Sequence, residues 1–188
     1  DLMLPKVKTI LTAITIFIFF LIVYNAFISR QIFSDGAMRC LPVWRHKNIF
    51  LHGWNHVLYP VGVYLWYKIM ALLNMAPETP LGFIINTARM NAFAASLSLV
   101  LFFGILEALV ERRIISFAGT VALGFSNVFL FYATNGDEPM LGYLFSIFSL
   151  FLIIQAVGKK KIFFFFLSAF FLSLAIMFYM TMISIVPG

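Results

Sequence analysis

Acidic side chains are rare in this sequence, and three of them stand where they can do chemistry. Asp and Glu together account for seven of the 188 residues. Asp35 follows the first long apolar run, and Asp137 and Glu138 lie in a polar turn between two later runs. Two positioned carboxylates permit general-base catalysis on a hydroxyl or an amine, or coordination of a divalent cation. We therefore take Asp35 and Asp137 as candidate catalytic residues and Glu138 as a candidate substrate contact; the alternative is solvated loop acids or helix caps.

Histidine and arginine residues form a second group of candidates. His52 and His56 are four residues apart, a spacing that places two side chains on one face of a helix and suits zinc. Gly53 disfavours a helix there and no third ligand has suitable spacing, so we favour a substrate or phosphate contact and assign no metal ligand. Arg39, Arg45 and Arg89 are candidate phosphate partners, because a guanidinium pairs bidentately with phosphate. For Arg45 we prefer the alternative of an ordinary arginine at the membrane surface, and the alternative for the other four residues is contact with lipid headgroups.

The elements that must position these residues are membrane helices. The chain is 63% hydrophobic and 11% charged, whereas soluble domains carry roughly 25% charged residues. Its apolar runs are long enough to cross a bilayer, so we predict an all-α integral membrane protein. The net charge of +6 comes from short clusters beside these runs, which argues against nucleic acid as a partner. The single Cys40 excludes a disulfide between two residues of this 188-residue segment.

The apolar runs predict one transmembrane domain over residues 1–188, expected to be the N-terminal portion of a longer protein. We predict five spans, at about 9–29, 86–110, 114–133, 139–157 and 162–186. Residues 30–85 then form a long first outer loop. An apolar stretch at 61–75 within this loop is bounded by Pro60 and Pro77 and contains Lys68, which favours an interfacial amphipathic helix over a sixth span.

The basic clusters predict the orientation, because cytoplasmic loops are enriched in Lys and Arg. With five spans, three clusters share the cytoplasmic face with the N-terminus: Lys6 and Lys8, Arg112 and Arg113, and Lys159–Lys161. The loop 30–85 and the turn 134–139 then share the opposite face. A sixth span at 61–75 would move two of the three clusters outside, so we reject it. Five basic residues in the outer loop depart from the rule: Arg30, Arg39, Arg45, Lys47 and Lys68.

The order of these features resembles the GT-C superfamily of polytopic glycosyltransferases, in particular the protein O-mannosyltransferase-like and aminoarabinose-transferase-like branches. An acidic residue shortly after the first span, a long outer loop and an acidic start of the fourth span carry the resemblance. The matching segments are Ser34-Asp35-Gly36, His56-Val57-Leu58-Tyr59-Pro60, Ala88-Arg89-Met90-Asn91 and Tyr132-Ala133-Thr134-Asn135-Gly136-Asp137-Glu138-Pro139-Met140.

The resemblance implies transfer of a sugar from a polyprenyl-phosphate donor to a protein, lipid or glycan acceptor on the non-cytoplasmic face. It implies that Asp35 is the catalytic base, that Asp137 supports the site, and that the sugar is inverted. Many members of the superfamily have a paired acidic motif in the first loop, whereas Asp35 is followed by Gly36. This departure leaves the dependence on a divalent cation open, and no other cofactor is expected.

Two other function classes fit the same features. One is a transporter or flippase for a lipid-linked or anionic substrate, which would use the boundary charges for binding without chemistry. The other is a non-catalytic membrane subunit of a larger complex, whose partners would be further membrane subunits. We favour an enzyme, in a bacterial or archaeal plasma membrane rather than the endoplasmic reticulum.

Overall fold

The computed structural model describes residues 3–29, 35–46, 58–137 and 139–179. These residues form helices, and no strand occurs among them. The helices are α1 (Met3–Ala26), α2 (Asp35–His46), α3 (Tyr59–Leu72), α4 (Pro80–Val110), α5 (Arg113–Gly124), α6 (Asn127–Thr134), α7 (Pro139–Lys159) and α8 (Ile162–Phe178). The all-α prediction is confirmed.

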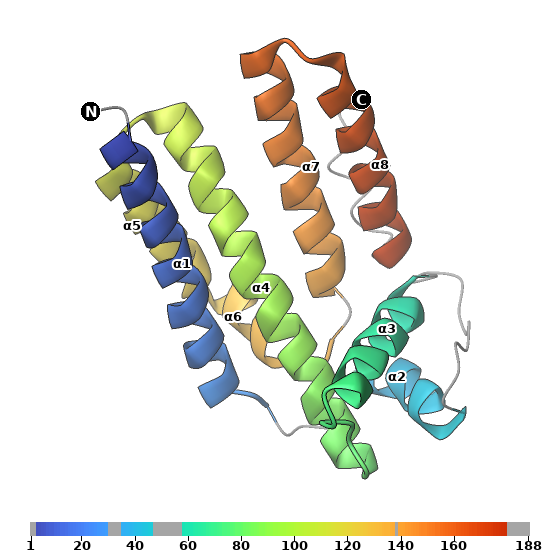
Figure 1. Cartoon of the computed structure of the whole chain (residues 1–188). Coiled ribbons are helices and arrows are strands. Elements are labelled where there is room, and N and C mark those ends of the chain that lie inside the picture. The colour runs from blue at the N-terminus through green and yellow to red at the C-terminus, as the bar shows by residue number, and fades with distance from the viewer. Residues whose placement is uncertain (1–2, 30–34, 47–57, 138, 180–188) are drawn as a thin grey trace.

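The helix α4 lies at the centre of the bundle. It packs against α1, α2, α3, α5, α6 and α7, and α8 packs mainly against α7. Figure 1 shows α1, α5 and α6 on one side of α4, α7 and α8 on the other, and α2 and α3 gathered at one end. The short helices α2 and α3 therefore cover the end of the bundle at which α4 begins.

Three helices are long and apolar enough to cross a membrane: Val7–Ala26, Pro80–Val110 and Pro139–Gly158. The pair α5 and α6 forms a fourth if it counts as one span, while α8 is apolar but has only 17 residues. These apolar helices are consistent with an integral membrane protein. A fifth span over 162–186 and the membrane position of the loop 30–85 stay predictions, since residues 180–188 lie outside the described part.

The predicted span 114–133 consists of two helices that meet at an angle of 63°. In a continuous helix the carbonyl oxygen of Gly124 would accept a hydrogen bond from the amide four residues later. Here that oxygen accepts a bond from the buried Tyr24 hydroxyl at 2.9 Å. Ser126 adopts an extended conformation and starts α6, with Leu130 N–H donating to its carbonyl oxygen at 2.9 Å. At the break, the hydrogen bond from Tyr24 of α1 therefore takes the place of the backbone hydrogen bond that Gly124 would accept in a continuous helix.

Small side chains line the buried face of α4. They let the neighbouring helices approach its backbone closely, as small residues do at membrane helix interfaces. Large rings of α1, including Phe20 and Tyr24, are fully buried in the same cluster. The buried small residues of α4 are Ala88, Ala92, Ala94, Ala95, Ser96 and Ser98. Their hydroxyls, where present, bond within the helix.

The structure of the segment 30–85 differs from the prediction at two helices, α4 and α2. The helix α4 begins at Pro80, not near residue 86, because Thr79 caps it: Thr79 Oγ1 accepts from Gly82 N–H at 3.0 Å and Pro80 occupies the first turn. The helix α2 was not predicted, while α3 agrees with the helix expected at 61–75. Its interfacial position stays a prediction.

The connections between the helices lie at two opposite ends of the bundle. The start of α1, the α4–α5 turn and the α7–α8 turn lie at one end, while the α6–α7 turn and α2 lie at the other (Figure 1). The first end carries the basic clusters near Lys8, Arg113 and Lys161. This grouping agrees with the arrangement expected from charge, and the cytoplasmic assignment of that end stays a prediction.

A methyl group at Gly124 should destabilise the bundle. A Cβ built there would collide with the Phe20 ring and lie 3.0 Å from Leu99 Cδ1, and overpacking of this kind costs about 1–3 kcal/mol. We expect Gly124→Ala to lower the midpoint of thermal unfolding in detergent. Gly158→Ala is the control, because its Cβ would meet nothing within 4 Å. Equal midpoints for the two variants would contradict the packing at Gly124.

Cysteine labelling tests the orientation. In a Cys40→Ala background, Glu78→Cys and Lys161→Cys each place one thiol at an exposed position, at opposite ends of the bundle. We expect a membrane-impermeant maleimide added outside intact cells to label Glu78→Cys only, and Lys161→Cys to react only after permeabilisation. Labelling of both variants from the outside would exclude the predicted sidedness.

Candidate functional site

The turn that carries Asp137 is held by side chains from two other helices. Asn91 of α4 donates hydrogen bonds from Nδ2 to the carbonyl oxygens of Asn135, at 2.8 Å, and Asp137. The hydroxyl of Tyr59, at the start of α3, donates to the carbonyl oxygen of Gly136 at 3.1 Å. Three consecutive carbonyl groups of the turn are therefore satisfied by distant parts of the chain.

These contacts are buried. Asn91 and Tyr59 are both 0% exposed, so their hydrogen bonds are protected from competition with water. Gly136 lies directly on α4, where a Cβ would be 3.4 Å from the carbonyl oxygen of Ile84. The turn therefore lies in contact with α4. These contacts hold the backbone at Asp137, whose side chain is half-buried.

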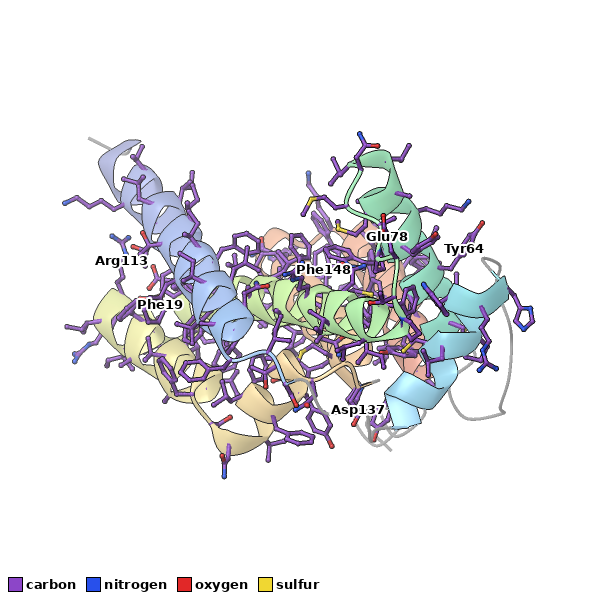
Figure 2. The ribbon with its side chains drawn as sticks, turned by 90° about the horizontal axis from the view of Figure 1, so that it is seen from below. Phe19, Tyr64, Glu78, Arg113, Asp137 and Phe148 are labelled. Carbon is purple, nitrogen blue, oxygen red and sulfur yellow. The ribbon has the colours of Figure 1, made fainter. Side chains whose placement is uncertain are left out.

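The chain that leads to Asp35 meets the same turn. Ser29 N–H donates to the carbonyl oxygen of Thr134 at 2.9 Å. Asp35 is six positions after Ser29, a separation that extended chain spans in at most about 21 Å, and Asp137 is three positions after Thr134. Asp35 begins α2, which packs against α4. Figure 2 shows Asp137 between α6 and α2. The backbones of the two candidate catalytic residues therefore share one end of the bundle.

The remaining candidates lie on α2, on α4 and outside the described part of the chain. Arg89 is exposed on α4 and makes no ion pair within the part of the chain that the structure describes. It stands two residues before the buried Asn91, so the helix turns the two side chains to different faces. Arg39 lies on α2, but its side chain, like that of Asp35, is outside the described part. His52, His56 and Glu138 also lie outside it. Their predicted roles stay predictions.

An aromatic cavity of about 300 Å³ adjoins the Asp137 turn between α6 and α7. Its lining residues are mostly apolar: Leu123, Ser126, Val128, Phe129, Tyr132, Pro139, Met140, Tyr143 and Tyr179. The Phe129 and Tyr143 rings meet edge to face at a centroid separation of 5.4 Å. Pro139, two residues after Asp137, belongs to this lining. The part of the bundle that carries the Asp137 turn therefore also holds an apolar aromatic hollow.

Asn91 and Tyr59 were not among the predicted site residues. The available signal was an amide in the interior of an apolar helix, which needs a polar partner when buried. Asn91 Oδ1 is buried and has no hydrogen-bond partner among the described residues. No three His, Cys, Asp or Glu side chains of the described residues group as a metal site requires.

Comparison with known proteins assigns no family. No family model, no curated protein and no solved structure matches this chain. Any function assigned to it therefore rests on the geometry of this end of the bundle and on the sequence motifs.

Removal of the Asn91 amide should loosen the turn. Asn91→Leu leaves two partly buried carbonyl groups without their donor, and each such loss costs at most about 1–3 kcal/mol. We expect faster hydrogen–deuterium exchange in a peptide covering residues 132–140 and a lower unfolding midpoint. Asn25→Leu is the matched control, because the Asn25 amide is exposed and bonds only to Leu21 in its own helix. Unchanged exchange in Asn91→Leu would show that Asn91 does not hold the turn.

Proposed function

We propose that this protein is a membrane glycosyltransferase that moves a sugar from a polyprenyl-phosphate donor to a protein, lipid or glycan acceptor on the non-cytoplasmic face. One observation carries the proposal: the Asp137 turn and the chain leading to Asp35 are hydrogen-bonded together at the end of the bundle opposite the basic clusters. The motifs around Asp35, Arg89 and Asp137, which resemble those of the GT-C superfamily, support the same reading.

Asp35 acts as the general base in this proposal. It takes the proton of the acceptor hydroxyl while that oxygen attacks the anomeric carbon. The bond between the anomeric carbon and the phosphate oxygen breaks, and the polyprenyl phosphate leaves with the electron pair, so the sugar is inverted. Asp137, held by its clamped turn, orients the reacting sugar or the acceptor.

The basic candidates Arg39, His52 and His56 stabilise the leaving phosphate, whose negative charge grows as the bond breaks. Arg89 leaves α4 on a different face from Asn91 and takes no part in this step. Glu138 contacts the sugar hydroxyls. A divalent cation, when bound, would be held by the carboxylates of Asp35 and Asp137 and would neutralise charge on the leaving phosphate. The described residues contain no group of three His, Cys, Asp or Glu side chains that could hold a metal ion by themselves.

The aromatic cavity supports a lipid-linked donor. Its lining is largely apolar and includes Pro139, two residues after Asp137, and both α6 and α7 contribute to it. Isoprenoid units of a lipid already lie in hydrocarbon, so they would be held in such a cavity by van der Waals packing. A polyprenyl tail seated there would bring its phosphate toward the acidic end of the bundle.

A transporter of a lipid-linked or anionic substrate is the second candidate. The observation that favours it is the break between α5 and α6, since transporters often build their binding sites from discontinuous membrane helices. In this reading Asp35 and Asp137 bind substrate and transfer no group. The two candidates differ in whether a covalent product forms.

Asp35→Asn tests the proposal. The amide cannot accept the proton, and loss of a general base lowers the rate by about 100-fold to 10,000-fold. We expect transfer of radiolabelled sugar from a polyprenyl-phosphate donor to fall by at least about 100-fold, with donor binding retained. Glu111→Gln, an exposed acid at the opposite end, is the control and should keep full activity.

Undiminished transfer by correctly inserted Asp35→Asn protein would remove Asp35 as the base. If the wild-type protein in liposomes moves the lipid-linked sugar across the bilayer and makes no glycosylated product, the transporter reading replaces the proposal.

A further inference from the structure

A second cavity lies at the same end of the bundle but away from Asp137. It has a volume of about 520 Å³ and is formed by the last turns of α2 and α3 and by the connection to α4. The residues that matter here are Trp44, Arg45, Tyr67, Asn74 and Glu78. Figure 2 shows Glu78 and Asp137 on opposite sides of α4. The cavity is therefore separate from the candidate catalytic site, and its ligand can be inferred independently of the proposed function.

The cavity presents one positive and one negative side chain that are not paired with each other. Arg45 and Glu78 are both exposed, and neither forms an ion pair within the described part of the chain. A simple anion would be attracted by Arg45 and repelled by Glu78, and a simple cation the reverse. A zwitterion satisfies both charges, because its two ends can face opposite sides of the cavity.

Two aromatic side chains, Trp44 and Tyr67, line the same cavity as these charges. Trp44 is held by a hydrogen bond from Nε1 to the carbonyl oxygen of Pro77 at 3.4 Å. The Tyr67 ring packs on Phe83 with a centroid separation of 5.8 Å. Aromatic faces attract ammonium groups, and indole is the strongest of them. The wall therefore suits the cationic end of a zwitterion, with Glu78 close by in the lining.

Exposed apolar side chains stand beside lining residues in the sequence. Leu72, Leu73 and Met75 fall between the lining residues Ala71, Asn74 and Ala76, and Leu72 is 84% exposed. Neighbouring exposed apolar side chains are typical of surfaces that contact a membrane or another apolar partner. A ligand with a polar head and an apolar tail would match both the cavity and these apolar side chains.

We propose that this cavity binds the headgroup of a zwitterionic phospholipid. Arg45 holds the phosphate through its guanidinium, and the ammonium lies against Trp44 and Tyr67 near Glu78. The acyl chains run over Leu72, Leu73 and Met75. A neutral glycan would use the aromatic rings and hydrogen bonds but would leave both charges without a partner and these apolar side chains bare.

Native mass spectrometry of the protein released from nanodiscs tests this site. The nanodiscs contain equal amounts of phosphatidylethanolamine, phosphatidylcholine and phosphatidylglycerol. We expect the wild-type protein to retain zwitterionic lipid over phosphatidylglycerol, and the ratio of the first two lipids shows which ammonium fits. Arg45→Ala should weaken retention of zwitterionic lipid about tenfold. Glu78→Ala should instead raise retention of phosphatidylglycerol, because the repulsion is gone.

Lys68→Ala is the matched control. Lys68 is an exposed cation on α3 that lies over the Tyr64 ring at 5.3 Å, outside the cavity lining, so its loss should leave retention unchanged. Arg45→Glu combined with Glu78→Arg keeps both charges and should recover zwitterionic retention relative to either single change. Equal retention of the three lipids by the wild type, equal effects of Arg45→Ala and Lys68→Ala, or displacement of the lipid by a soluble oligosaccharide would each overturn the proposal.

Discussion

The close approach of neighbouring helices to α4 is the constraint on which the rest of the structure depends. Within a bilayer, burial of apolar surface gives helices little reason to associate, so packing contacts and interhelical hydrogen bonds must hold them. The buried alanine and serine side chains of α4 let its neighbours approach closely, and α1, α5, α6 and α7 all pack against this helix. Asn91 lies on the same helix and provides the hydrogen bonds. One helix thus organises the bundle and positions the Asp137 turn.

The break between α5 and α6 follows from the same constraint. A free carbonyl group in an apolar environment costs several kcal/mol by rough reckoning, so a membrane helix breaks only where another group satisfies its backbone. Tyr24 does this for Gly124, and the absence of a side chain on Gly124 lets α1 come close enough. The break redirects the chain into α6, whose end leads to the turn held by Asn91 and Tyr59. The candidate site therefore depends on a contact in the bundle interior.

The placement of Asp137 was accessible to sequence reasoning in part. Charge clusters indicated that Asp35 and Asp137 belong to one end of the molecule, and the hydrogen bond between Ser29 and Thr134 joins the chains that carry them. The sequence did not indicate that Asn91, and not Arg89, contacts the Asp137 turn. The two residues are two positions apart on α4, and only the packing of α4 shows that Asn91 is buried against the turn while Arg89 is exposed.

The sequence by itself determined the all-helical class and the approximate helices, because the length and polarity of an apolar run decide membrane partitioning locally. The sequence also indicated which connections lie at the ends of the bundle, because charged side chains are unfavourable in hydrocarbon. Only the tertiary structure decided the bend at Gly124, the hold on the Asp137 turn and the charged cavity beside Trp44. The reason is that these features join residues far apart in the chain, such as Tyr59 and Gly136, and a polar group's partner depends on which helices meet in space.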